Sequence, residues 1–254
     1  MKYLVRRVVN KITRGRWLKL ISLISPLIKD DILYYLNTDI GRKLYFSGDF
    51  ENEELHLCKK FIKDDSTIID IGANIGIHSI YFSKLAPKGI VISIEPQVTI
   101  YPVLLQNISK YNNIIPLNVA VDTDLKISPF FIADDNAYSS LKDTRRKKIL
   151  NVKQVITIPI DLILNLFDKV DFIKIDVEGY EKNVLSSMKE LLLRYKPVLF
   201  IEIYQGLNSN EDPVGTVRML TDMGYKAYIV NNDKSLEKFT SHSDSNYNYF
   251  FIYE

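Results

Sequence analysis

Short apolar runs that alternate with helical segments constrain this chain more than any other feature. Five such runs follow one another from residue 66 onward, at residues 67–71, 90–94, 114–121, 171–175 and 198–203. Their Ile, Val and Leu residues are continuous rather than alternating with polar ones, which is typical of parallel strands buried on both faces. Helices are predicted between them, at residues 77–85, 100–109 and 181–193. This order predicts right-handed βαβ units and a doubly wound, mostly parallel sheet of the Rossmann-like α/β class.

The C-terminal part of the chain extends this sheet. A helix is predicted over residues 212–223, and it ends at Gly224, a residue that favours helix ends. Residues 226–230 and 247–253 can then pair as a terminal antiparallel hairpin.

The segment between the third and fourth runs is less regular. Two extra strands are predicted at residues 126–133 and 155–160, and a loop is predicted at residues 142–153. The basic residues of this loop are Arg145, Arg146, Lys147 and Lys148. A charge run of this kind either faces a phosphate or belongs to a solvated loop, which is the commoner case.

Length and composition bound the class of protein. A chain of 254 residues, 46% of them hydrophobic, can bury a sizeable core, either as one domain with an extension or as at most two small domains. Cys58 is the only cysteine, which excludes an internal disulfide and a cysteine-based zinc cluster. The apolar run at residues 20–28 contains Pro26 and is shorter than the roughly 18 residues that a membrane span needs.

The N-terminal segment differs in charge from the rest of the chain. Residues 1–20 hold no acidic residue and seven basic ones, which are Lys2, Arg6, Arg7, Lys11, Arg14, Arg16 and Lys19. Because the net charge of the whole chain is +2, the remaining residues carry a net charge of −5. This negative charge argues against a main domain that binds nucleic acid. Leu4, Val8 and Ile12 share one predicted helical face. Residues 1–19 therefore either pack on the main domain with a solvated basic side or contact an anionic membrane.

The strongest local signal is a glycine turn between the first apolar run and the helix after it. Gly72, Asn74 and Gly76 lie in this turn, and glycine lets a backbone turn tightly and approach a ligand closely. The helix start adds unpaired N–H groups and a positive dipole end, which suit a carboxylate as well as a phosphate. Glu95 follows 19 residues after Gly76, where an acid can accept hydrogen bonds from both hydroxyls of a ribose. Together they predict a nucleoside site.

The residue between the two glycines narrows the choice of nucleoside. A dinucleotide fingerprint has the pattern G-x-G-x-x-G, and here Asn74 stands in place of the second glycine. Its side chain would crowd a pyrophosphate, but it could help to hold the charged groups of an amino acid. S-adenosylmethionine is therefore favoured over NAD.

Three residues are candidates for proton transfer. Asp176 follows the fourth run, at the strand end where a doubly wound sheet binds ligands, and it is the leading candidate for the base. Alternatively, Asp176 and Glu178 could cap the following helix. Glu202 lies at the end of the fifth run. His78 is either a base of near-neutral pKa or a packing residue beside the glycine turn. Asp176 and Glu202 could also bind a divalent metal ion that lowers the pKa of a hydroxyl.

Two segments resemble the signature segments of the FkbM family of S-adenosylmethionine-dependent methyltransferases. They are IDIGANIGIHS, residues 69–79, and DFIKIDVEGYEKNVL, residues 171–185. The resemblance runs from about Phe46 to Tyr253 and includes FSGDFENEEL before the first signature and NAYSSL between the two. It implies a class I methyltransferase fold with seven core strands and an antiparallel last hairpin. We predict a methyltransferase domain at residues 46–254, preceded by a basic, partly helical extension at residues 1–45.

The resemblance also implies an activity and a set of cofactor residues. The activity is O-methylation of a sugar, including a nucleotide-activated one for surface polysaccharide, or of another hydroxylated natural product. The residues placed at the cofactor are Glu51, Asp70, Gly72, Asn74, Gly76 and Glu95, with the turn at the methionine end and Glu95 at the ribose. Asp176 would lie near the transferred methyl, and residues 123–153 would choose the acceptor.

Three other functions fit the sequence less well. Nucleic-acid methylation would use residues 1–19 as a basic arm, but the acidic body argues against it. An NAD-dependent oxidoreductase conflicts with Asn74 and lacks an obvious substrate domain. An inactive regulatory module would not need Asp176 and Glu202. We therefore expect a cytoplasmic enzyme with a small-molecule acceptor and no nucleic-acid partner.

Overall fold

The computed structural model describes most of the chain. The described residues are Lys11 and residues 27–29, 31–36, 38–47, 53–203, 212–230, 235–240 and 247–254. The predicted helical face of Leu4, Val8 and Ile12 lies outside them, as does Glu51.

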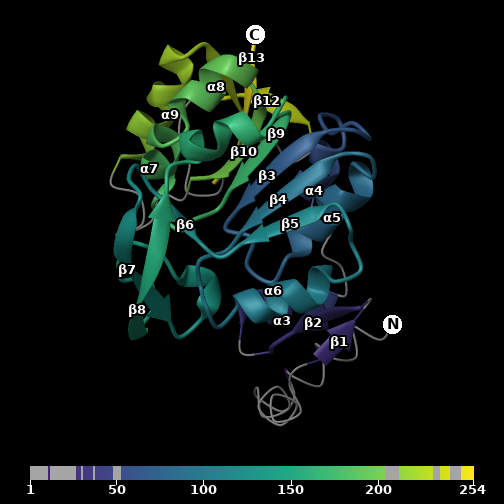
Figure 1. The fold of residues 1–254 in the computed structure, drawn as a ribbon, viewed down its shortest axis with the longest axis vertical. Helices are drawn as coiled ribbons and strands as arrows, with labels where there is room; N and C mark the ends of the chain where they lie inside the picture. Colours follow the sequence, from purple (N-terminus) through teal and green to yellow (C-terminus); the bar gives the residue numbers. More distant parts are fainter. Residues whose placement is uncertain are drawn as a thin grey trace.

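A twisted central sheet organises the described residues, and eight strands form it (Figure 1). Their order is β12 (Leu236–Lys238), β11 (Tyr225–Val230), β13 (Asn248–Tyr253), β10 (Val198–Glu202), β9 (Phe172–Ile175), β3 (Thr67–Ile71), β4 (Ile90–Ile94) and β5 (Ile114–Leu117). The five strands from β10 to β5 are parallel, and β13 runs antiparallel to both of its neighbours. This arrangement confirms the predicted doubly wound class I architecture. The short edge strand β12 is added to the seven predicted strands, and it lies between β11 and β13 in the sequence.

The continuous apolar runs form strands because both faces of the sheet are covered. Ile71 and Ile175 belong to a core shared with α7 (Glu181–Ser186), α8 (Lys189–Tyr195) and α9 (Pro213–Asp222). On the other face, Ile68 and Phe172 pack in a second core with α5 (Ile77–Leu85) and α6 (Tyr101–Ile108). Side chains alternate between the faces with a period of two, so every residue of β3 and β9 is buried.

The predicted helix over residues 181–193 is wrong in one respect, because the structure divides it into α7 and α8. Asp161 explains the division, since its carboxylate accepts hydrogen bonds from the backbone N–H groups of Glu190 (3.0 Å) and Leu191 (2.9 Å) at the start of α8. A carboxylate in this position satisfies N–H groups that a helix start leaves without partners. The signal comes from residue 161, far outside the periodic segment.

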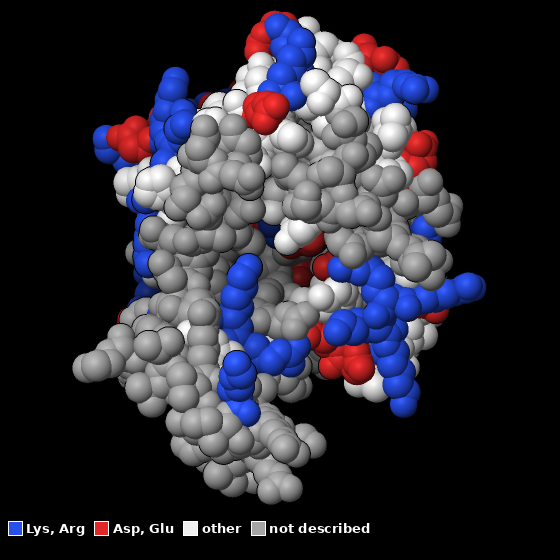
Figure 2. All heavy atoms as spheres, turned by 180° about the vertical axis from the view of Figure 1, so that it is seen from behind, with Lys and Arg blue, Asp and Glu red and all other residues white. Residues whose placement is uncertain are grey.

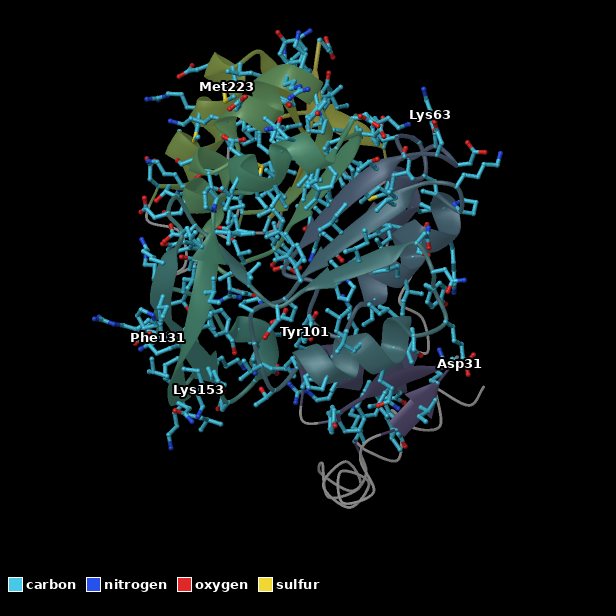
Figure 3. All side chains as sticks on the ribbon, viewed as in Figure 1. Asp31, Lys63, Tyr101, Phe131, Lys153 and Met223 are labelled. Carbon is cyan, nitrogen blue, oxygen red and sulfur yellow. The ribbon has the colours of Figure 1, made fainter. Side chains whose placement is uncertain are left out.

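The third apolar run also splits, because β5 ends at Leu117 and β6 (Ala120–Val121) joins a second sheet. This small sheet has the order β6, β8 (Ile149–Ile158), β7 (Lys126–Ala133). The predicted strand over residues 126–133 is confirmed, but β8 begins earlier than predicted and takes up part of the expected loop at 142–153. Phe131 and Lys153 mark the small sheet, which lies to one side of the central sheet (Figure 3).

Three elements near the N-terminus pack beside α6. They are β1 (Leu27–Lys29), β2 (Ile32–Tyr34) and α3 (Asp39–Ser47), and α4 (Glu53–Cys58) follows them. The side chain of Asn107, on α6, accepts from the N–H of Leu33 (2.7 Å) and donates to its carbonyl (3.1 Å). The division at residues 45 and 46 stays a prediction. None of the helices in the described part of the chain is long and apolar enough to cross a membrane.

Candidate active site

A cavity of about 760 Å³ opens at the carboxyl ends of the parallel strands. Its walls come from the turn after β3, the end of β4, strand β6, the short helix η1 (Asn136–Tyr138) and the ends of β9 and β10. Strand β3 lies between β4 and β9, so the strands that follow it in the sequence lie on both sides of it and the strand order reverses there. Ligands of doubly wound folds bind at such a switch point.

The glycine turn forms one end of the cavity and depends on close backbone contacts. Gly72 has φ 80°, and a Cβ there would lie 1.8 Å from the backbone oxygen of Asp176. Gly76 has φ 90°, and a Cβ there would lie 2.6 Å from the side chain of Leu104. Asn74 also has a positive φ, of 50°, which asparagine tolerates better than most residues. The glycines therefore let the turn pack against the end of β9 and against α6.

Glu95 lies beside this turn and is almost fully buried, at 6% exposure. One carboxylate oxygen accepts the N–H of Asn74 (2.8 Å) and the other accepts the N–H of Gln97 (2.7 Å). Burial raises the pKa of Glu95 to about 7, although the two backbone N–H groups act to lower it. A carboxylate has about four lone-pair positions, so acceptor capacity is left for two ligand hydroxyls.

Lys174 is a site residue that sequence reasoning missed. Its ammonium lies 3.0 Å from the carbonyl oxygen of Gly72, 3.3 Å from Asp176 and 3.5 Å from Asp70, and its side chain is 3% exposed. Burial alone would lower the pKa of Lys174, but the charges of Asp176 and Asp70 outweigh it and raise the pKa. A lysine within the apolar strand FIKI was the available signal, since an unpaired charge is costly to bury.

Asp70 is not among the residues that line the cavity. It is fully buried, and one of its oxygens accepts the hydroxyl of Ser79 at 2.5 Å. The structure therefore places Asp70 behind Lys174 rather than at a ligand-facing position, and its predicted contact with the cofactor is not supported by this geometry.

Three carboxylates form the other end of the cavity and are called the carboxylate cluster here: Asp176, Glu178 and Glu202. One oxygen of each lies within 4.8 Å of the others. Burial, followed by the charge of Asp176, raises the pKa of Glu202 to about 8 and that of Glu178 well above its ordinary value. Like charges this close cannot all ionise easily, so the cluster can retain a proton near neutral pH.

The predicted capping of α7 by Asp176 or Glu178 is not observed. The N-cap of α7 is Tyr180, which makes no side-chain capping bond, and the N–H of Gly179 donates instead to Glu181. Glu178 has a positive φ of 54° and forms an ion pair with Arg146. Its carboxylate therefore belongs to the cavity.

His78 lines the cavity but has the wrong acidity for a base at neutral pH. Burial, together with the nearby charge of Lys174, lowers its pKa to about 3. Its ring stacks on Phe82 with the ring centroids 6.2 Å apart. The geometry favours the packing interpretation of His78.

The basic loop after β7 is divided between cavity and solvent. Arg146 lines the cavity, with its guanidinium carbon 4.7 Å from the ring centroid of Tyr138, whereas Arg145 is exposed. The ammonium of Lys147 lies 4.8 Å from the same ring. Lys43, from α3, also lines the cavity. Figure 2 shows a hollow with basic side chains at its edges and acidic ones within it.

The structure brings most of the predicted site residues into this one cavity. Those that line it are Gly72, Asn74, His78, Glu95, Asp176 and Glu202, and Gly76 supports the turn.

A doubly wound parallel sheet with an antiparallel last pair, a glycine turn and a buried acid at the next strand end defines a class I S-adenosylmethionine-dependent methyltransferase. Residues 70–227, more than half of the chain, match the profile of the Methyltransferase FkbM domain. The chain therefore belongs to the FkbM family of methyltransferases. The resemblance noted in the sequence is confirmed, and the oxidoreductase alternative is set aside.

The chain is also similar to individual proteins. Hexuronic acid methyltransferase AglP of Haloferax volcanii is 24% identical over 227 residues, which are 85% of this chain and 89% of that protein. The structure of methyltransferase FkbM from Methylobacillus flagellatus KT matches with a TM-score of 0.50 and 16% identity, over 75% of this chain and 44% of that one. This chain thus spans less than half of that structure, which shows the fold alone. The structure of fibrillarin from Aeropyrum pernix, with natively bound S-adenosyl-L-methionine, matches with a TM-score of 0.47 and 14% identity, over 78% of this chain and 73% of that one.

Proposed function

We propose that this methyltransferase acts on a hydroxyl group of a sugar or of another hydroxylated small molecule. The observation that carries the proposal is that a single cavity joins a nucleoside-type site at Glu95 to the carboxylate cluster. Its volume of about 760 Å³ falls within the range of small-molecule sites.

The cofactor end is formed by the glycine turn and Glu95. Glu95 would accept hydrogen bonds from the ribose, because its carboxylate is already oriented by the N–H groups of Asn74 and Gln97. The turn and Asn74 would hold the methionine end of the cofactor. S-adenosylmethionine supplies an electrophilic methyl on a sulfonium. The protein must then hold the acceptor oxygen in line with that methyl, and such positioning can supply roughly 7–11 kcal/mol.

The carboxylate cluster would take the proton that the acceptor hydroxyl loses. Asp176 is the leading base, since it lies between the ammonium of Lys174 and the two glutamates. Glu202 is the second candidate, because a pKa of about 8 suits a group that exchanges a proton near neutral pH.

The acidity of this end favours a hydroxyl over a carboxylate as the reacting group. A hexuronic acid, the substrate class in the name of the AglP relative, carries both. A carboxylate needs no base to attack a methyl group, and three acidic side chains would repel it. The expected product is therefore a methyl ether rather than a methyl ester.

A divalent cation at the carboxylate cluster is the alternative to proton transfer. Three carboxylate oxygens within 4.8 Å fit the preference of hard cations for oxygen ligands. Lys174, however, lies 3.3 Å from Asp176, and Arg146 forms an ion pair with Glu178. These protein cations already supply the compensating charge, so we propose transfer without a metal.

Three further details belong to the proposal. They are a cytoplasmic location, a nucleotide-activated acceptor for surface polysaccharide, and the role of residues 1–19 as packing segment or membrane contact. Deleting residues 1–19 should leave turnover of a dissolved acceptor intact, and loss of binding to anionic vesicles would support the membrane contact.

The test is a coupled assay for S-adenosylhomocysteine release across a panel of glycosides, nucleotide sugars and a nucleic-acid control. We expect release with at least one sugar and none with nucleic acid. The isolated product should keep its methyl group in dilute alkali, as an ether does. Loss of the methyl in alkali would identify carboxyl methylation, and release with nucleic acid alone would overturn the proposal.

A further inference from the structure

Asn136, in the η1 segment, carries a polar atom that the described protein does not satisfy. Its side-chain oxygen is buried, has no hydrogen-bond partner there, and belongs to a residue that lines the cavity. Buried polar atoms are nearly always paired in folded proteins, and leaving one unpaired costs free energy. A ligand that donates a hydrogen bond would satisfy this atom.

The backbone around Asn136 is fixed, so its orientation is not the result of a loose loop. Asp135 caps η1 by accepting the N–H of Ala137 (3.3 Å) and forms an ion pair with Arg42 (3.0 Å). The hydroxyl of Ser140 donates to the carbonyl of Val177 at 2.8 Å. This bond ties the segment to the loop that carries Asp176 and Glu178, which is the acceptor side of the cavity.

Arg146 provides a second tie to the same loop and a positive charge at the cavity wall. It pairs with Glu178, lies over the ring of Tyr138, and keeps 17% of its side chain exposed. Its guanidinium is planar and always charged, a geometry that suits carboxylate and phosphate groups. Lys147, over the same ring, and Lys43, at the cavity wall, add positive charge.

We propose that Asn136 and Arg146 form an acceptor subsite that binds a hydroxyl donor beside an anionic oxygen group. The inference rests on the proposed function and deepens it, because it names the acceptor as a negatively charged sugar. Asn136 accepts a hydrogen bond from a hydroxyl of this sugar. Arg146 binds its carboxylate or phosphate, and this group is not the one that is methylated. The basic loop thereby sets acceptor specificity.

The test compares four probes on the enzyme: methyl glucoside, methyl glucuronide, glucose 1-phosphate and a nucleoside diphosphate glucose. Binding to the enzyme with S-adenosylhomocysteine is measured by calorimetry, and methyl transfer is measured by release of that product. We expect one anionic class to be preferred over the glucoside by at least about tenfold, the worth of one charge-assisted hydrogen bond. A preference for the glucuronide identifies a carboxylate, and one for the other two probes identifies a phosphate.

The variant Arg146→Gln should bring the ratio of anionic-probe affinity to glucoside affinity close to one. Arg145→Gln removes the same charge from the exposed neighbour and should leave the preference unchanged. Asn136→Asp keeps the shape but adds a negative charge, so it should weaken anionic probes more than the glucoside. If Arg146→Gln unfolds because Glu178 loses its partner, Arg146→Lys is used instead of that variant. It keeps the positive charge but lacks the planar fork of the guanidinium, so it should lower the preference.

Two results would overturn the inference. The first is that no anionic probe binds better than the glucoside. The second is that the preference survives in Arg146→Gln or, where that variant unfolds, that it is undiminished in Arg146→Lys. Methyl transfer to neutral sugars without a preference would overturn only the inference. Absence of transfer to every sugar would instead count against the proposed function.

Discussion

Two glutamates at the ends of parallel strands show how differently the two ends of the cavity are built. Glu95 follows β4, and both of its oxygens accept backbone N–H groups. Glu202 ends β10, and its nearest electrostatic neighbours are side chains, chiefly Asp176 and Lys174. Burial raises the pKa of both, to about 7 for Glu95 and about 8 for Glu202.

The cofactor end of the cavity is therefore preorganised by backbone hydrogen bonds, and the end with the carboxylate cluster by the charges of side chains. A carboxylate held by two backbone N–H groups is suited to binding, because its position does not depend on its neighbours' protonation. A carboxylate among other acids changes charge easily and is suited to moving a proton. Substitutions at the two ends should therefore affect different measurements, namely cofactor affinity at Glu95 and turnover at the carboxylate cluster.

The largest effect is expected for Asp176→Asn, which removes a negative charge and keeps the size. If Asp176 is the base, turnover should fall by roughly 10²–10⁴, with cofactor affinity unchanged. Asp124→Asn is the matched control, because that side chain is 67% exposed. The unmodified enzyme should keep its activity in a chelator, and loss that Mg²⁺ restores would show a metal instead. Near-normal turnover of the variant would move the base to Glu202.

The next largest effect is expected for Lys174→Met, as a loss of unfolding free energy, because the substitution leaves Asp70 and Asp176 without their shared cation. Breaking a buried ion pair on one side costs about 3–5 kcal/mol of unfolding free energy. Urea denaturation measures this loss, and Lys169→Met, which removes a half-exposed lysine whose ion pairs are open to solvent, should change stability much less. A loss in Lys174→Met no larger than in this control would show that the buried pair contributes little. Lys174 would then not couple the glycine turn to Asp176.

The fold was predictable because its signals are local. Continuous apolar runs identified the parallel strands, and the glycine turn located the switch point at β3. The failures came from distant residues: Asp161 divides the predicted helix into α7 and α8. The early start of β8 reflects antiparallel pairing with β7, which gives strand structure to residues that read as a polar loop.

The site was predictable at the cofactor end and less so at the other. Glu95 and Asp176 could be placed because parallel strands end at a common edge. Lys174 and Arg146 could not be assigned from spacing, since their roles depend on distant residues, as with the bond from Lys174 to Gly72, 102 positions away. Asp70 is a different case, because a motif position does not reveal whether a side chain faces the cavity.

Glu95→Ala should lower the affinity for S-adenosylmethionine by at least about tenfold, since each charged hydrogen bond to the ribose contributes roughly 1.5–3 kcal/mol. Turnover at saturating cofactor should change much less. Calorimetry with S-adenosylhomocysteine measures the affinity, and Glu190→Gln on the exposed surface of α8 is the control. If affinity stays the same and turnover falls, the two ends have been assigned the wrong way round.

A smaller effect is expected in the pH dependence of the carboxylate cluster. Turnover should rise with pH through about 8, because the carboxylate cluster can accept a proton more readily once Glu202 has lost its own. Because the folded pKa lies above the unfolded value of 4.5, the contribution of Glu202 to stability is full below 4.5 and is lost as pH rises through about 8. Glu202→Gln should flatten both profiles, raising the melting temperature relative to the unmodified protein at pH 9. Unchanged profiles would assign the titration to Glu178.

The smallest effect is expected for His78→Gln. Burial and Lys174 lower the pKa of His78 to about 3, so its imidazole is neutral throughout the working range and holds a proton poorly. Turnover should therefore change by less than about threefold, far below the loss that removal of a general base causes. The ring contact with Phe82 would be lost, so a modest fall in melting temperature is the expected signature. The measurement is turnover at pH 6 to 9, with the melting temperature of the same preparations. A drop of a hundredfold or more with an intact fold would place proton transfer at His78 rather than at the carboxylate cluster.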